Sequence, residues 1–431
     1  MSISSFSLKS SKATLTSQSG LILFGEFCGK IKLHNLIKKE LPSPGSNRGY
    51  SPEEYVFPLI MMLHAGGNHL EDIRVIGRDK GLRCLTGLDS IPEAGTIGDW
   101  LRRQGANTGI DGLKRVNRSI VDRTLRPIKK KNLTLDIDAT GIIGNKFDAL
   151  CTYKGFKGYM PILGHIAENG VIVAEEFRAG NVAPATDNLG FVKQCVSQLP
   201  EGKCFKYLRA DAASYQAGLI NYCEEHTMSY AIGGKMCSSL KKTILRVPDS
   251  SWKRYIDKHD VRTDSEITTI AWSMEHTPRP FSMIVKRTLV KNPDLFDSEK
   301  YSYHLVATNR LEDDSQTVLH WYCQRGEHSE NRLKELKNGF AQDRMPCGTQ
   351  EANAVFFRIG ALAYNLFVLF KQQVLGKRWK RSQIQSIRLH IYNLPGKIVR
   401  AARKVILQIP EATFSQLQKI RHKIQALSGY T

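Results

Sequence analysis

The chain has 431 residues, of which 41% are hydrophobic and 24% are charged, a composition that excludes a disordered protein and allows two or three packed domains. Its 62 Lys and Arg residues outnumber its 41 Asp and Glu residues, which gives a formal net charge of +21. Positively charged side chains in such excess repel one another unless a polyanion offsets their charge, so nucleic acid is the expected partner. The alternative is a basic enzyme whose charge serves only solubility.

The sequence predicts a cytoplasmic protein that does not bind membranes. It contains no run of about 18 apolar residues, and the N-terminus, MSISSFSLKSSK, lacks the apolar core of a signal peptide. The nine cysteines are odd in number, scattered along the chain, and form no C-x-x-C pair. We therefore expect reduced thiols, and neither a disulfide framework nor a zinc site.

Residues 1–128 are predicted to form a helical DNA-binding domain. From Gly20 to Ile128 the apolar residues recur at helical spacing, and the breaks carry Gly and Pro. Residues 90–101 suit a short turn followed by a helix that Thr96 would cap. This pattern fits a helix-turn-helix, and it fits equally two packed helices that do not contact DNA.

The pattern changes at Asn132, where apolar and polar residues begin to alternate as in a half-buried strand. The predicted elements are strands at 132–140, 161–167 and 171–177, a helix at 188–199, a strand at 205–209, and a helix at 215–226. The turn Glu168-Asn169-Gly170 joins the second and third strands, because Asn-Gly accepts positive φ at low cost. Residues 129–232 are thus expected to form the first part of an RNase H-like α/β core.

Three further segments complete the expected organisation. Residues 233–310 have short apolar runs separated by turns, which predict a β-rich insertion. Helical periodicity resumes in residues 311–375, the expected second part of the core. Residues 376–431 carry twelve Lys and Arg residues and one acid, Glu411, and are predicted to be a basic helical region. This region would bind DNA or, alternatively, pack on the core as two helices.

Two acids stand at the ends of predicted strands. Asp138 lies near the end of strand 132–140, and an acid in so apolar a strand is costly unless it is paired or binds a metal. Asp136 points in the same direction, because strand periodicity is two, and only one of the two is expected to be needed. Asp211 lies just beyond strand 205–209, where α/β sheets present their reactive groups.

Other candidates lie on a helix, in a turn and in the insertion. Glu330 and Lys337 share one side of the helical segment 322–337, which could also be an ordinary charged helix. Residues 153–159 interleave aromatics with Lys154 and Lys157, which suits frayed DNA ends or a hairpin that covers the sheet. Trp252 and Trp272 could stack on an extruded base, although core packing is the default.

Five ordered segments resemble a known family of enzymes. They are LDIDAT at 135–140, YKGFKGYMP at 153–161, FRAGN at 177–181, RAD at 209–211 and SENRLKELK at 329–337. They are similar to the insertion-sequence transposases of family thirteen-eighty, within the DDE group that has a Y-R-E-K signature. The likeness also covers GLILF at 20–24, RGYSP at 48–52 and AYNL at 363–366.

The resemblance implies which residues act. Asp138, Asp211 and Glu330 correspond to the catalytic triad that binds metal, and Tyr322, Arg325 and Lys337 correspond to the other signature residues, which contact DNA. Six residues separate Glu330 from Lys337 as in the signature, whereas four, rather than three, separate Arg325 from Glu330. Two Mg²⁺ or Mn²⁺ ions about 4 Å apart would serve both ends of an in-line displacement.

The resemblance also implies a function. The chain would bind the terminal inverted repeats of a bacterial insertion sequence near the nucleoid, cleave them, and join them to target DNA. Binding two ends implies a homodimer in the active complex. The alternatives are an RNase H-like nuclease that cuts without joining and an inactive protein that only occupies DNA ends.

Overall fold

The computed structural model describes residues 6–45, 49–259, 261–290 and 300–427. The chain divides into two compact units: unit 1 comprises residues 1–116, 338–342 and 351–431, and unit 2 comprises residues 117–337 and 343–350. The sequence suggested five consecutive segments. The structure instead joins the first and last of them in unit 1.

Unit 2 is built on a nine-stranded mixed sheet with the order β10-β11-β12-β13-β9-β8-β2-β6-β7. The strands of this sheet that come first in the chain are β2 (Asn132–Ala139), β6 (Ile162–Ile166), β7 (Ile172–Glu176), β8 (Cys204–Ala210) and β9 (Ser229–Gly233). β2, β6 and β7 form an antiparallel meander, and β8 pairs parallel to both β2 and β9. With α8 (Asn188–Ser197) and α9 (Ala217–Glu225), these elements follow the predicted order, and the mixed α/β class is confirmed.

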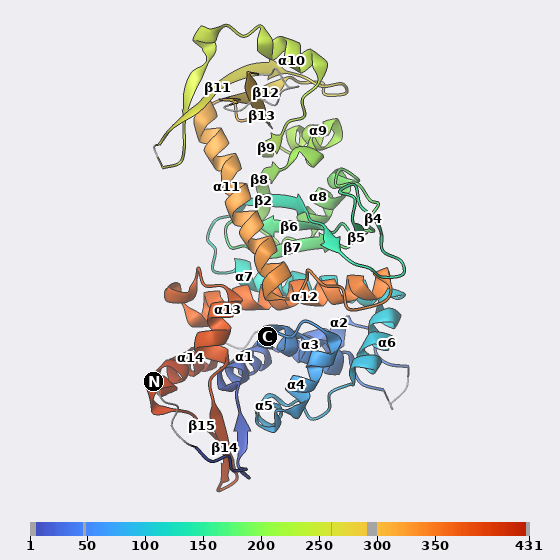
Figure 1. Ribbon diagram of the computed structural model, residues 1–431, viewed down its shortest axis with the longest axis vertical. Coiled ribbons are helices and arrows are strands. Elements are labelled where there is room, and N and C mark those ends of the chain that lie inside the picture. Colours follow the sequence, from blue (N-terminus) through green and yellow to red (C-terminus); the bar gives the residue numbers. More distant parts are fainter. Residues whose placement is uncertain (1–5, 46–48, 260, 291–299, 428–431) are drawn as a thin grey trace. The chain divides into compact units, whose positions relative to one another are not determined.

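The expected β-rich insertion extends this same sheet. β10 (Lys253–Ile256), β11 (Arg262–Trp272), β12 (Phe281–Leu289) and β13 (Tyr301–Thr308) pair antiparallel in succession. β13 then pairs antiparallel with β9, so the strands of the insertion continue the core sheet (Figure 1). The helix α10 (Ser238–Leu245) and the short η3 (Asp249–Ser251) precede them.

Helix α11 (Ser315–Lys334) runs across this sheet, and its sequence explains both its start and its buried side (Figure 1). Asp314 caps it by accepting hydrogen bonds from the backbone N–H groups of Gln316 and Thr317. Val318, Leu319, Tyr322 and Leu333 are buried at helical spacing. The helix packs against β2, β8, β9 and β11. It therefore covers the centre of the sheet.

The half-buried character predicted for β2 is wrong. Thr134 and Asp136 are as buried as their apolar neighbours, because α11 covers their face of the strand. The burial of these polar residues means that each needs a partner.

A small sheet follows β2 directly. It has the order β3-β5-β4 and consists of β3 (Ile142–Ile143), β4 (Leu150–Cys151) and β5 (Lys157–Tyr159). Figure 1 shows it next to β6 and β7, and Tyr159 of β5 forms an isolated antiparallel bridge with Ala179, just beyond β7.

The N-terminal part of unit 1 is helical, as predicted. Its helices are α1 (Ser19–Lys30), α2 (Leu33–Glu40), α3 (Pro52–Ala65), η1 (Leu70–Asp72), α4 (Ile73–Arg78), α5 (Lys80–Thr86) and α6 (Ala94–Gly105), and α7 (Gly109–Leu125) leads into unit 2. The predicted cap at Thr96 is wrong, because α6 already begins at Ala94 with Glu93 at the N-cap position.

Helix α12 (Gln350–Phe370) and the π-turn η5 (Lys371–Leu375) are long and apolar enough to cross a membrane by length and composition alone. Every residue of the apolar window is buried, which is the arrangement of a core helix. Two of its polar residues, Asn353 and Asn365, are buried too.

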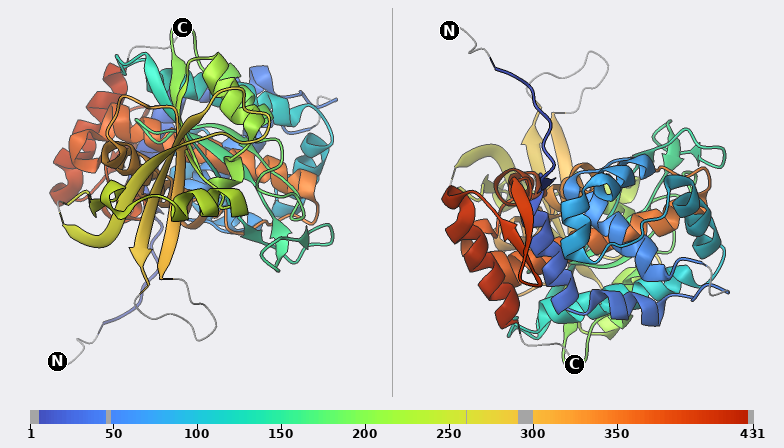
Figure 2. Two further views of the ribbon diagram at one scale, coloured as in Figure 1. Left: turned by 90° about the horizontal axis from the view of Figure 1, so that it is seen from above. Right: turned by 90° about the horizontal axis from the view of Figure 1, so that it is seen from below.

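The prediction of a purely helical segment 376–431 is wrong. It contains η6 (Lys377–Trp379), α13 (Ile384–Ile387), η7 (Arg388–Tyr392), the hairpin β14 (Gly396–Ala401) and β15 (Lys404–Gln408), and α14 (Glu411–Ala426). β14 pairs with β1 (Thr14–Thr16), and α14 packs against α1 (Figure 2). This basic segment is therefore part of the core of unit 1.

Candidate catalytic site

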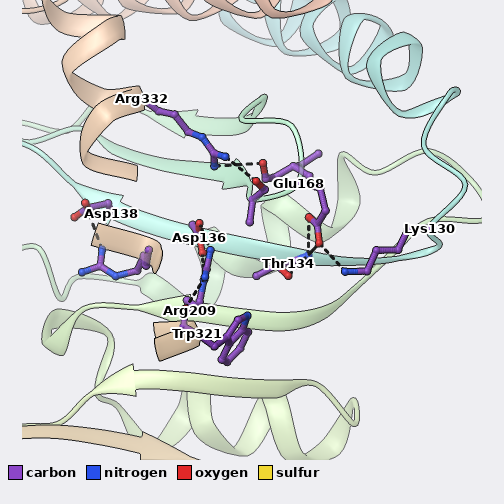
Figure 3. Close-up of polar contacts among 11 residues, drawn as sticks. Lys130, Thr134, Asp136, Asp138, Glu168, Arg209, Trp321 and Arg332 are labelled. Carbon is purple, nitrogen blue, oxygen red and sulfur yellow. Dashed lines mark hydrogen bonds and ion pairs between the residues drawn. The ribbon is translucent and has the colours of Figure 1, made fainter. Parts of the chain in front are cut away.

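Asp136 and Asp138 lie on the face of β2 that α11 covers, but they have different partners (Figure 3). Asp136 is fully buried, and its two carboxylate oxygens accept hydrogen bonds from Nε and Nη2 of Arg209 at 2.7 and 2.8 Å. Arg209 also donates to the carbonyl of Trp321 on α11, at 2.6 Å. Asp136 thus ties β2, β8 and α11 together.

Asp138, two residues further along β2, retains a side chain that is 17% exposed. Its Oδ2 lies 3.4 Å from Nη1 of Arg325. Burial raises the pKa of Asp138 to about 6; Arg325 opposes this effect, whereas Asp211 and Glu330 add to it. The two other acids of the predicted triad therefore lie close enough to Asp138 to act on its charge.

The pairing of β2 with β8 explains why Asp211 is near. The two strands are parallel, and Ile137 stands opposite Ala210, so the next residues of the strands are Asp138 and Asp211. Asp211 begins η2 (Ala212–Ser214) and accepts a hydrogen bond from the N–H of Ala213 at 3.1 Å. The structure places both acids at one edge of the sheet, as the sequence predicts.

Glu330 lies on α11 with an exposed side chain. It affects the pKa of Asp138, but the three acids are not in coordinating positions: among the described residues, no group of three His, Cys, Asp or Glu side chains is close enough to hold one metal ion. The triad thus converges on one region, and a shared cation would require its members to move closer.

Arg325 and Tyr322 lie one turn apart on α11, with the guanidinium 5.8 Å from the ring centre. The Tyr322 ring is buried and packs in a cluster with Ala231, Val306 and Val318. Burial raises the pKa of its hydroxyl above the usual value, and Arg325 works against that rise. The structure therefore gives Tyr322 a packing role, whereas Arg325 faces Asp138.

Lys337 also reaches the end of β2. Its Nζ donates hydrogen bonds to the carbonyl of Gly141, at 2.8 Å, and to Oγ1 of Thr140, at 3.4 Å. Burial lowers the pKa of Lys337; Asp343 opposes this effect, whereas Lys154 adds to it. Lys154 therefore lies near Lys337 and has an exposed side chain, as does Lys157 on β5.

The π-turn η4 (Glu335–Gly339) contains Lys337 and follows the segment with the unusual signature spacing. One extra residue between Arg325 and Glu330 rotates the rest of an α-helix by about 100° relative to the residues before it. A π-turn closes i→i+5 hydrogen bonds and so takes up one residue more than an α-helical turn. The π-turn lies after Glu330, so it changes the helix geometry around Lys337 and leaves the spacing between Arg325 and Glu330 unaffected.

Two arginines that the sequence reasoning missed hold α11 in place. One is Arg209, described above. The other is Arg332, whose Nη2 donates to the carbonyl of Ala167 at 2.6 Å, in the turn between β6 and β7 (Figure 3). Gly170 in that turn has a φ of +84°, and a Cβ there would lie 2.9 Å from Nε of Arg332.

The same turn is tied to the start of β2. Glu168 accepts hydrogen bonds from the N–H and Oγ1 of Thr134 and pairs with Lys130 at 3.0 Å (Figure 3). The Asn-Gly signal predicts the turn, but nothing in the local sequence identifies Arg332 or Thr134 as its partners.

Comparison with known protein families identifies the chain. Residues 4–428 match the model of the family described as "Transposase DDE domain group 1". The chain belongs to this family. Its members are transposase enzymes that generally use divalent metal ions, and the broader part of the resemblance, a DDE transposase, is confirmed. The narrower assignment to family thirteen-eighty stays a prediction.

No protein of curated function matches this transposase sequence. Among solved structures, it is similar to the piggyBac transposase in a synaptic complex with hairpin DNA, determined by cryo-electron microscopy. The identity is 11% and the TM-score 0.49, over 89% of this chain and 82% of the other.

The residues of this DDE transposase fit a divalent cation in their chemistry. Carboxylate oxygens are the ligands that Mg²⁺ and Mn²⁺ prefer. The repulsion from Asp211 and Glu330 that raises the pKa of Asp138 is a repulsion that a bound cation would remove. Asp138, Asp211 and Glu330 are therefore the residues that would hold it.

The two tryptophans of the predicted insertion differ in their accessibility. Trp252 is buried, and the guanidinium of Arg287 lies 4.0 Å from its ring centre, so it packs within unit 2. Trp272 ends β11, opposite Phe281 on β12, and is partly exposed.

Proposed function

We propose that this transposase binds the terminal inverted repeats of an insertion sequence and catalyses metal-dependent strand cleavage and strand transfer on an RNase H-like core. The observation that carries the proposal is the electrostatic convergence of Asp138, Asp211 and Glu330, which come from two neighbouring strands and the covering helix. Three separated segments of the chain thus supply acids to one region.

The chemistry requires an oxygen nucleophile and stabilisation of the leaving oxygen. Water attacks the phosphorus, and the 3′ oxygen leaves and takes up a proton. This 3′-hydroxyl then attacks a phosphodiester of the target DNA, where the new P–O bond replaces the bond to the target's 3′ oxygen, which leaves with the proton. Bound Mg²⁺ or Mn²⁺ supplies Lewis acidity for these displacements. Asp138, Asp211 and Glu330 would hold the cation, and Lys337, Lys154 and Lys157 offset the charge of phosphates beside the scissile bond.

In the metal-free protein, Arg325 balances the charge of Asp138: its Nη1 lies 3.4 Å from Oδ2 of that residue. Tyr322 contributes by packing, because its ring is buried. Two DNA ends require two active sites, so we propose a homodimer in the active complex, close to the nucleoid. The family match supports a transposase. The presence of all three acids argues against an inactive end-binding protein, and the joining assay described below distinguishes a transposase from a nuclease that only cuts.

The proposal is tested with Asp138→Asn, Asp211→Asn and Glu330→Gln. Each removes a charge and almost no volume, so cleavage of the element's own ends should fall to background while gel-shift affinity changes by no more than about twofold. Glu312→Gln is the matched control, because Glu312 is an exposed acid just before α11 and should leave both activities unchanged.

A second assay separates joining from cutting. Pre-cleaved ends with a free 3′-hydroxyl are incubated with a target plasmid and Mg²⁺. Wild-type protein that nicks ends but never joins them would show a nuclease. Triad variants that lose DNA binding together with cleavage would contradict the metal-binding role.

A further inference from the structure

The small sheet β3-β5-β4 and its two turns, residues 142–159, expose four large apolar side chains. Phe147 is 97% exposed, Ile143 66%, Tyr153 64% and Leu150 43%. Single exposed apolar residues are common on protein surfaces, but a cluster of them in one short segment marks an interaction site. We call this segment the lobe.

The two aromatic residues stand at the tips of turns. In the turn 146–149, the N–H of Ala149 bonds to the carbonyl of Lys146 at 3.2 Å, and Phe147 occupies the second position. In the turn 152–155, the N–H of Gly155 bonds to the carbonyl of Thr152 at 3.0 Å, and Tyr153 occupies the second position. Hydrogen-bonded turns thus present both rings to the solvent.

The lobe carries a net positive charge. Its three lysines are Lys146, Lys154 and Lys157, and its single acid is Asp148. That carboxylate accepts hydrogen bonds from the hydroxyl of Tyr159, at 2.8 Å, and from the backbone N–H of Gln350. Because both oxygens of Asp148 accept hydrogen bonds from within the protein and three lysines outnumber this one acid, the lobe presents aromatic rings together with net positive charge.

The lobe lies next to the candidate catalytic site. The ring of Phe156 packs on Gly141, where an added Cβ would lie 2.5 Å from its Cζ atom. The carbonyl of Gly141 is the acceptor for Lys337, and Lys154 lowers the pKa of that lysine. A DNA strand held at Lys337 therefore passes within reach of the lobe.

We propose that the lobe binds unpaired nucleotides of a melted DNA end, with Phe147 and Tyr153 stacked on bases and Lys154 and Lys157 on phosphates. This proposal rests on the proposed function. Aromatic rings interleaved with lysines suit single strands, because the faces of bases are accessible only where the duplex has opened. A second copy of the lobe is a poor partner, since its like charges would repel.

The test compares two probes bound to full-length protein in Mg²⁺-free buffer. One is a blunt duplex of the element's own terminus; the other is the same duplex with its last two base pairs mismatched. Wild-type protein should prefer the mismatched probe, and Phe147→Ala should weaken binding to it by about tenfold, as loss of one stacked base does. Binding to the blunt duplex should stay within about twofold.

Two variants serve as controls. Phe147→Trp should retain the preference, because indole also stacks. Leu311→Ala removes a comparably exposed apolar side chain outside the lobe and should change nothing. A 2-aminopurine at the mismatched position should be quenched by wild-type protein and remain bright with Phe147→Ala.

Each other outcome overturns the proposal in its own way. Equal loss of both probes would show a duplex contact, and no loss would show that Phe147 does not touch DNA. A change from dimer to monomer in light scattering would assign the lobe to a second copy of the chain. Failure of the proposed function is seen separately, as wild-type protein that binds ends but never cleaves them when Mg²⁺ is added.

Discussion

The substitution Asp136→Asn removes one charge from the ion pair at the centre of unit 2. Arg209, whose side chain is 2% exposed, would then keep its bond to the carbonyl of Trp321 but lose its counter-charge. Removing one partner of a buried ion pair costs about 3–5 kcal/mol, because the remaining charge stays buried without compensation. We expect a loss of this size in the free energy of unfolding of unit 2.

The assay is urea unfolding at pH 7.5 with a chelator and a reducing agent. Tryptophan fluorescence follows the surroundings of the Asp136–Arg209 ion pair, since the Arg209 guanidinium lies 5.5 Å from the ring centre of Trp321. Asp138→Asn is the matched control: it makes the same change on the same face of β2. It should not destabilise the protein, because burial already disfavours the charged form of Asp138.

Removing both charges of the pair should restore much of the lost stability. Replacing both partners, with Asp136→Leu and Arg209→Met, should recover much of the stability, because no charge is then left buried. A loss below about 1 kcal/mol for Asp136→Asn, the value typical of exposed pairs, would refute the buried pairing. So would a double variant less stable than the single one.

The remaining predictions concern Asp138 and the basic C-terminal segment. The folded pKa of Asp138, about 6, lies above the value of 3.8 for an unperturbed Asp, so the metal-free protein should lose stability as pH rises from about 4 to 6, by about 3 kcal/mol. Urea titrations at several pH values should show that Asp138→Asn abolishes this loss. Mg²⁺ or Mn²⁺ should raise the Tm of the wild-type protein but not that of the variant. Changing four exposed residues (Lys377, Arg378, Lys380 and Arg381) to Gln should flatten the slope of log K against log salt by about 0.9 for each phosphate that the protein no longer neutralises. An unchanged slope in a folded variant would place these residues away from DNA; Arg388 is left intact, because it holds the carbonyls of Leu63 and His64.

The sequence by itself determined the local elements and the position of the acids within them. Alternation at 132–140 and the Asn-Gly turn at 169–170 predict the meander, since both depend on neighbouring residues only. The placement of Asp138 and Asp211 at strand ends follows in the same way from the local pattern, whereas their proximity depends on the parallel pairing of β2 with β8. The helical N-terminal segment follows from periodicity alone.

Only the tertiary structure decided which distant residues meet. Asp136 and Asp138 look alike in the sequence, and they differ because Arg209 on β8 faces one and Arg325 on α11 faces the other. The hairpin β14–β15 escaped prediction because its turn holds Ala402 and Arg403 at positive φ, where hairpin sequences usually carry Asn or Gly. The second partner of β14 is β1, at the opposite end of the chain. Phe147 reads as a core residue by type, and its exposure results from a turn that packing leaves uncovered. Contacts between residues that are distant in the sequence depend on which surfaces meet after folding, and local hydrophobic periodicity does not predict them.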